Sequence, residues 1–140
     1  MMVILDTNVL SEAAKPVPSP AVMRWLAAQP FLSLFTTAIT QAEILYGIEL
    51  LPKGKRRVAL QAAAEGIFAE DFAGRILPFD AVAAQTYPQI RAARKSTGRP
   101  LADADAQIAA IARVHRASVS TRNTADFEGC GITVINPWKV

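Results

Sequence analysis

Side chains with metal-binding oxygens follow apolar runs at several separate places in the chain. Asp6 comes directly after "VIL", and Glu43 lies shortly after the strand-like "FTT". Asp105 opens the helical stretch "DAQIAAIA", and the segment after "VST" offers Asn123 and Asp126 as candidates for a fourth position. A carboxylate at the tip of a buried strand is costly unless a partner offsets its burial. These residues therefore predict a shared site.

Three or four carboxylates in one cleft repel one another and stay ionised only around a cation. Oxygen ligands without histidine or cysteine favour Mg²⁺ or Mn²⁺. Such an ion usually acts on phosphates, as a Lewis acid or by generating a hydroxide nucleophile. The predicted chemistry is hydrolysis of a phosphate ester, and the net charge of +3 is compatible with a nucleic-acid substrate.

Each acid also has a purely structural interpretation. Asp6 could cap the short helix that follows it, and Glu43 near a helix start is favoured by the helix dipole. Asp103 and Asp105 are two residues apart, so they cannot share a helix face. Asp103 suits the helix cap, and Asp105, in register with the apolar residues that follow it, suits the site.

Helices and strands alternate along the chain. The expected strands are 3–5, 31–37, 75–79, 117–121 and 131–138, and the expected helices are 7–14, 21–29, 40–51, 55–72, 81–96 and 103–116. Ser19, followed by Pro20, and Asp80 are expected N-caps, and Pro88 is expected to kink or cap its helix.

This alternation predicts the fold class. Strands separated by helices pair in parallel through right-handed crossovers, which gives a three-layer α/β fold of about five strands. Ligands of such folds bind outside the carboxyl ends of the strands, and Asp6 lies at one of these ends. The length of 140 residues suits a single domain over residues 1–140.

Composition excludes several classes of protein. With 51% hydrophobic and 19% charged residues the chain is globular. Cys130 is the only cysteine, so the chain has no internal disulfide and no cysteine zinc site. The N-terminal apolar run is too short for a signal or membrane span, and we expect a soluble, cytoplasmic protein. His115, the only histidine, is expected at a helix C-terminus in a structural role.

Two further features have alternative interpretations. Lys53, Lys55, Arg56 and Arg57 form the clearest basic cluster, which is either a solvated helix start or a contact for phosphates or an acidic partner. The side chains of the large aromatic residues are expected to serve packing or dimer contacts rather than base stacking; these are Trp25, Tyr46 and Trp138.

The sequence resembles a known protein family nearly from end to end. The segments that carry the resemblance are "ILDTNVLSE", "TAITQAEILYGIELLPKGKR", "FAGRILPFD", "ADAQIAAIA" and "STRNTADFEGCGITVINPW". In this order they are similar to the PIN-domain ribonuclease toxins of VapC type from type II toxin–antitoxin modules, especially the FitB-like branch. The resemblance implies a PIN fold, with a parallel five-stranded sheet flanked by helices, and Mg²⁺- or Mn²⁺-dependent cleavage of RNA. It also implies a homodimer, inhibition by a small VapB-like antitoxin, and contact with DNA only through that antitoxin.

Carried over by motif, Asp6 and Asp105 are the principal metal ligands and Glu43 completes the pocket. The groups expected to orient ligands or substrate are Thr7, Asn8, Thr121, Arg122 and Asn123. FitB-like relatives can carry aspartate after "TR", whereas this chain has Asn123, so either Asn123 or Asp126 completes the catalytic set.

The sequence also admits two rival functions. A phosphotransfer enzyme of the haloacid-dehalogenase type needs a second aspartate two residues after the first, and this chain has Asn8 there. A non-catalytic PIN-like binding or scaffold module is the alternative, although such modules tend to lose the acids that this chain keeps.

Overall fold

The computed structural model describes all residues, 1–140, and contains one parallel sheet. Its strands are β1 (Val3–Leu5), β2 (Leu34–Thr37), β3 (Ile76–Leu77), β4 (Ser118–Ser120) and β5 (Val134–Ile135), in the order β3-β2-β1-β4-β5. All four neighbouring pairs are parallel, with Ile4 opposite Phe35 on one side and Val119 on the other. The predicted α/β class with a parallel five-stranded sheet is confirmed.

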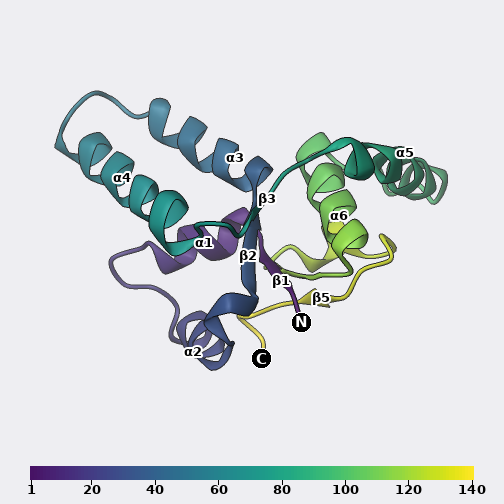
Figure 1. Cartoon of the computed structure of the whole chain (residues 1–140), viewed down its shortest axis with the longest axis horizontal. Coiled ribbons are helices and arrows are strands. Elements are labelled where there is room, and N and C mark those ends of the chain that lie inside the picture. The colour runs from purple at the N-terminus through teal and green to yellow at the C-terminus, as the bar shows by residue number, and fades with distance from the viewer.

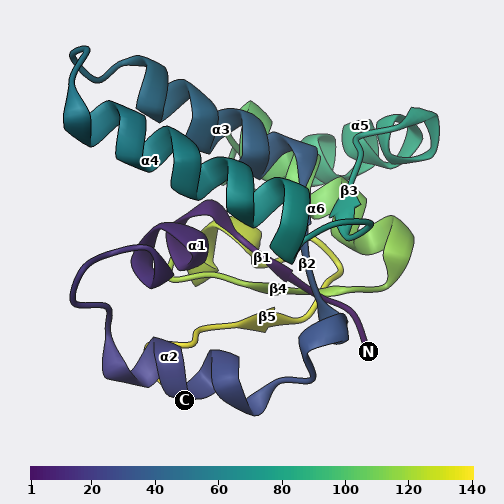
Figure 2. The same cartoon turned by 60° about the vertical axis from the view of Figure 1, so that its left-hand side comes forward.

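Six helices flank this sheet (Figures 1 and 2). They are α1 (Thr7–Ala13), α2 (Pro20–Ala28), α3 (Ala38–Glu49), α4 (Lys55–Gly66), α5 (Ala81–Ser96) and α6 (Asp103–His115). The helices α3 and α4 form a hairpin whose connecting loop projects beyond the sheet, as both views show. None of these helices combines the length and the apolar character needed to cross a membrane.

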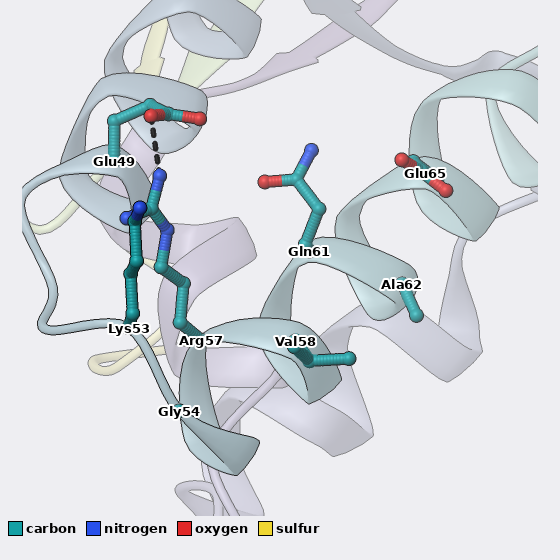
Figure 3. Close-up of a pocket in the computed structure, with 8 residues that line it drawn as sticks. All are labelled: Glu49, Lys53, Gly54, Arg57, Val58, Gln61, Ala62 and Glu65. Carbon is teal, nitrogen blue, oxygen red and sulfur yellow. Dashed lines mark hydrogen bonds and ion pairs between the residues drawn. The ribbon is translucent and has the colours of Figure 1, made fainter.

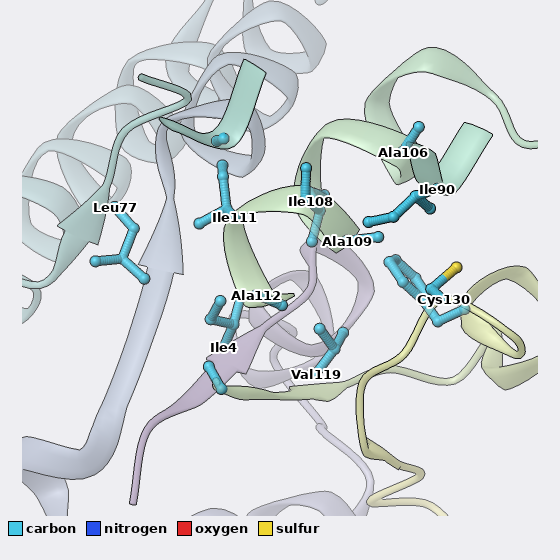
Figure 4. Close-up of a cluster of buried hydrophobic side chains, with 14 of the residues drawn as sticks. Ile4, Leu77, Ile90, Ala106, Ile108, Ala109, Ile111, Ala112, Val119 and Cys130 are labelled. Atoms are coloured by element: carbon cyan, nitrogen blue, oxygen red, sulfur yellow. The ribbon is translucent and has the colours of Figure 1, made fainter. Parts of the chain in front are cut away.

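Two hydrophobic clusters lie on opposite faces of the sheet, because successive residues of a strand point to opposite sides. Ile4 and Val119 pack against α5 and α6 in one cluster, which Figure 4 shows. Val3 and Leu5 belong to the other cluster, with residues of α1, α3 and α4. The run "VIL" is buried throughout because the central strand β1 is covered on both faces.

The helix caps follow the sequence with one exception. Ser19 caps α2 and Asp80 caps α5, as predicted. Asp103, however, does not cap α6: the cap is Ala102, and Asp103 is the first helical residue, where its carboxylate accepts hydrogen bonds from Tyr87 and Arg91. A nearby basic partner on α5 thus replaced the local capping bond.

Other differences concern element boundaries. The expected strand 31–37 begins as a 3-10 turn, Phe31–Ser33, so β2 starts only at Leu34. Helix α3 begins at Ala38, two residues earlier than predicted, because the Thr37 side chain caps it. Helix α4 ends at Gly66 and continues as a π-helical turn, Ile67–Asp71. Helix α5 runs through Pro88, which lies on its exposed side, where water can reach the carbonyl that loses its partner.

Candidate active site

Asp6 lies at the carboxyl end of β1 and is buried, with 6% of its surface exposed. Its backbone N–H donates to the Ser120 carbonyl of β4 at 3.0 Å, which fixes the residue to the neighbouring strand. One carboxylate oxygen, Oδ1, accepts from the Thr7 N–H at 2.8 Å and caps α1. Asp6 therefore does cap α1, as its structural interpretation predicts, but the cap uses only one of the two carboxylate oxygens.

The second oxygen of Asp6 faces the loop after β4. Thr121 Oγ1, fully buried, donates to Asp6 Oδ2 at 2.8 Å. The Asn8 amide lies between the same two residues, 3.4 Å from Asp6 Oδ2 and 3.1 Å from Thr121 Oγ1, and its own oxygen accepts from the Arg122 N–H. The Asn123 N–H donates to Thr121 Oγ1 at 3.1 Å. These bonds join the β1–α1 turn to the segment after β4.

Glu43 approaches the same place from α3. Its Oε1 accepts from Thr7 Oγ1 at 2.8 Å, and Thr7 Oγ1 also lies 3.2 Å from Thr40 Oγ1. Thr7 thereby ties the start of α1 to α3, one residue away from Asp6. Thr40 is fully buried and was not among the predicted site residues.

Asp105 stands in the first turn of α6, half-buried. Burial, together with the negative charges of Asp6, Asp126 and Glu43, raises the pKa of Asp105 from 3.8 to about 6. The pKa of Asp6 is also raised, chiefly by burial, and the hydrogen bonds from Thr121 and Thr7 oppose this rise while Glu43 and Asp126 add to it. The four carboxylates therefore act on one another electrostatically although they come from distant segments.

Asn123 and Asp126, the two candidates for the fourth position, lie in and beside the turn after β4. Asp126 lies in a 3-10 turn, Thr124–Phe127, and its charge reaches both Asp6 and Asp105. Asn123 enters the network through its backbone N–H. Asp126 is therefore linked to the other acids through its charge, and Asn123 through a backbone hydrogen bond.

Arg94 of α5 is a residue that the sequence analysis missed. It is buried, with 6% exposed, and donates through Nη1 to the carbonyls of Asp126 and Glu128 at 3.1 and 2.7 Å, and through Nε to the Arg99 carbonyl at 2.7 Å. No carboxylate pairs with Arg94, and its charge lowers the pKa of Asp105. Its spacing of four residues from buried Ile90 on one helix face is the signal that could have identified it.

The donor chemistry fits a hard divalent cation. The acids offer only oxygen, and a cation between them would offset the burial and the repulsion that together raise the pKa of Asp105. No group of three or more acidic, histidine or cysteine side chains is already arranged to hold an ion.

Comparisons of the chain with a family model and with known proteins identify the same family. A family model described as PIN domain matches residues 3–128. The chain is 44% identical over 138 residues to VapC ribonuclease Y4jK of Sinorhizobium fredii, with 99% of both chains covered. It is 42% identical over 137 residues to toxin FitB of Neisseria gonorrhoeae, with 98% of this chain and 99% of FitB covered.

The fold agrees with this similarity. A solved structure of FitAB bound to an IR36 DNA fragment matches with a TM-score of 0.94 and 42% identity, over 99% of this chain and 97% of that one. The sequence and structural matches cover the four carboxylates and the segments that position them. The chain therefore belongs to the PIN-domain family, as a member of its VapC type and FitB-like branch.

Proposed function

We propose that this protein is the toxin of a type II toxin–antitoxin module and that it hydrolyses RNA phosphodiester bonds with the help of Mg²⁺ or Mn²⁺. The observation that carries the proposal is the mutual effect of four carboxylates, Asp6, Glu43, Asp105 and Asp126, at the carboxyl edge of the sheet. The names of the related VapC ribonuclease and FitB toxin support it.

Asp6 and Asp105 are the proposed metal ligands, because both are partly or fully buried and both have a raised pKa. Glu43 and Asp126 complete the acidic pocket from the two sides. A bound divalent cation supplies a Lewis acid and lowers the pKa of water, so that hydrolysis proceeds near neutral pH.

The neighbouring polar residues keep the pocket in shape. Thr121 and Asn8 hold Asp6 Oδ2, and Thr7 holds Glu43, so these carboxylates lose little conformational freedom when a ligand arrives. The exposed Arg122 lies at the rim with its guanidinium 5.1 Å from the centre of the Trp138 ring. In this position Arg122 can bind a phosphate of the substrate.

The proposed partners follow from the family. FitB is found in the FitAB assembly on DNA, and we infer a VapB-like antitoxin for this chain, with DNA contacted only through that antitoxin. A homodimer and a cytoplasmic location belong to the same proposal.

Calorimetric titration of Mn²⁺ into the purified, antitoxin-free protein tests the metal site. We expect binding in the parent and its loss in Asp6→Asn and Asp105→Asn, with circular dichroism showing that both variants are folded. Asp103→Asn is the matched control: this carboxylate lies two residues from Asp105, is exposed and pairs with Arg91, so metal binding should persist.

RNA cleavage in Mn²⁺, tested on total RNA and on transfer RNA, should follow the same pattern. A folded Asp105→Asn variant that cuts RNA at the parent rate would refute the assignment. No Mn²⁺ binding in the parent, with or without RNA, would instead favour the non-catalytic binding module.

A further inference from the structure

One exposed face of α3 leads from the acidic pocket towards the tip of the α3–α4 hairpin. Glu43, Tyr46 and Leu50 are spaced by three and four residues, so they lie on one side of the helix. Tyr46 and Leu50 are each 66% exposed. At 1.5 Å per residue, Leu50 lies about 10 Å beyond Glu43 along the helix axis, a distance that a few nucleotides of single-stranded RNA can span.

Packing within the chain does not explain the residues on this face. The Tyr46 ring joins neither hydrophobic cluster, so of the two roles expected for it, packing or a dimer contact, packing within the chain does not apply. Gly47 follows it inside the helix, where glycine is less favourable than alanine, and a Cβ there would meet no atom within 4 Å. An exposed aromatic ring beside a bare stretch of helix leaves room for a flat ligand.

The hairpin tip carries the basic cluster noted in the sequence. Arg57 reaches across a cleft between α3 and α4 and pairs with Glu49 at 2.5 Å, as Figure 3 shows. Lys53, Lys55 and Arg56 are exposed and form no ion pair. We call these three residues the basic tip.

The basic tip does not serve to stabilise α4. The helix dipole favours acids in the first turn and disfavours cations there, yet Lys55 and Arg56 occupy the first turn of α4 and no acid does. Gly54 before them provides no side-chain cap. The interpretation as a solvated helix start therefore gives no reason for this concentration of charge, whereas an anionic ligand does.

We propose that the exposed face of α3 and the basic tip together form a track for single-stranded RNA, in which Tyr46 stacks on a base and the basic tip holds phosphates beyond it. The proposal rests on the proposed function, since the track begins at Glu43 of the acidic pocket. Charge complementarity selects the ligand: three unpaired cations match a polyanion, and an aromatic ring accepts any base.

Fluorescence anisotropy with a fluorescein-labelled, mixed-sequence 12-nucleotide RNA tests the track in EDTA, where no cleavage occurs. For single strands, each phosphate contact contributes about −0.7 to the slope of log K against log salt. The variant Lys53→Gln/Lys55→Gln/Arg56→Gln should therefore lower the steepness of this slope by about 2. A control variant with the same change in net charge replaces three exposed cations elsewhere by glutamine, Arg24, Lys95 and Arg116. It should leave the slope nearly unchanged.

Tyr46 is tested separately. Loss of one base–aromatic stack weakens single-strand binding by roughly 5- to 150-fold, and we expect this loss for Tyr46→Ala. Tyr46→Phe keeps the ring and should restore binding. Because the ring is exposed, both variants should unfold at the parent temperature.

Several results would overturn the track. Equal slopes for the basic-tip variant and its control would remove the phosphate contacts, and parent affinity in Tyr46→Ala would remove the stack. Weakened binding of an acidic antitoxin, or a change from dimer to monomer, with RNA affinity unchanged would assign the surface to a protein instead. Failure of the proposed function is distinguishable, because absent cleavage in Mn²⁺ would leave these binding results in EDTA intact.

Discussion

Replacing Asp105 by asparagine should stabilise the metal-free protein while abolishing metal binding. The rise in the pKa of Asp105 from 3.8 to about 6 corresponds to about 3 kcal/mol at full weight. Since the side chain is half-exposed, solvent screening reduces this to about 1.5 kcal/mol. Loss of the favourable interaction with the N-terminus of α6 costs about 0.5 kcal/mol. The net gain is therefore about 1 kcal/mol, or about 3–4 °C in Tm for a chain of this length.

The effect has a defined pH dependence. Because the folded-state pKa of Asp105 lies above its ordinary value, the folded protein binds this proton more tightly than the unfolded chain does. The repulsion is absent below about pH 4, develops as the pH rises to about 6 and is complete above it. The variant should consequently unfold at a higher temperature than the parent at pH 7.5. At pH 4 it should unfold at the same temperature as the parent or at a slightly lower one.

Thermal unfolding in EDTA, followed by circular dichroism at several pH values, measures this difference. Asp103→Asn is the control: the pKa of Asp103 is lowered by Tyr87 and Arg91, so its removal should give no gain at any pH. If Asp105→Asn and Asp103→Asn unfold alike at pH 7.5, at or below the parent temperature, burial and the neighbouring carboxylates do not destabilise the ionised Asp105.

Three further predictions concern the neighbours of the pocket. Thr121→Val removes the hydrogen bond to buried Asp6 and should lower the free energy of unfolding in urea by about 1.5–3 kcal/mol. It should also raise the pKa of Asp6 further and weaken Mn²⁺ binding. Unchanged urea unfolding and an unchanged Mn²⁺ titration would contradict this prediction. Arg94→Met leaves the carbonyls around Asp126 without their donor and should lower the free energy of unfolding by about 3 kcal/mol. Amide hydrogen exchange should become faster locally, in residues 124–128. Ser120 Oγ is buried without a hydrogen-bond partner, so Ser120→Ala should leave the free energy of unfolding unchanged or raise it by up to about 1 kcal/mol. A clear decrease in this free energy in the same assay would reveal a partner for the hydroxyl.

The central elements of the fold could be predicted from local sequence. Three consecutive apolar residues at 3–5 indicated a strand covered on both faces, and Ser19 and Asp80 marked helix starts through caps that depend only on adjacent residues. The parallel pairing of the strands followed from their alternation with helices, whereas their order in the sheet came only from the structure. Such features depend on neighbours in sequence, which is why sequence alone was sufficient.

The remaining features depend on partners that are distant in sequence. Asp103 has the chemistry of a cap, but Arg91 and Tyr87 of another helix bind it. Arg94 is one of several basic residues on α5, and only the fold reveals that its guanidinium lies against the turn that carries Asp126. The acids Asp6, Glu43 and Asp105 were predicted from their places at strand and helix ends, and Thr7 and Thr121 were expected beside them from the family resemblance. Buried Thr40, which lies 3.2 Å from the Thr7 hydroxyl, was recognised only from the tertiary structure.

The position of β1 at the centre of the sheet has a consequence for synthesis of the protein. Asp6 is synthesised 115 residues before its partner Thr121, and β1 is flanked by β4 only when residues 118–120 have been made. Contacts of such separation form late, because all the residues between the two partners must be made first. A ribosome-bound nascent chain, or one truncated before β4, therefore lacks the assembled pocket. The proposed activity can therefore appear only after residue 121 has been made, however early Asp6 itself is synthesised.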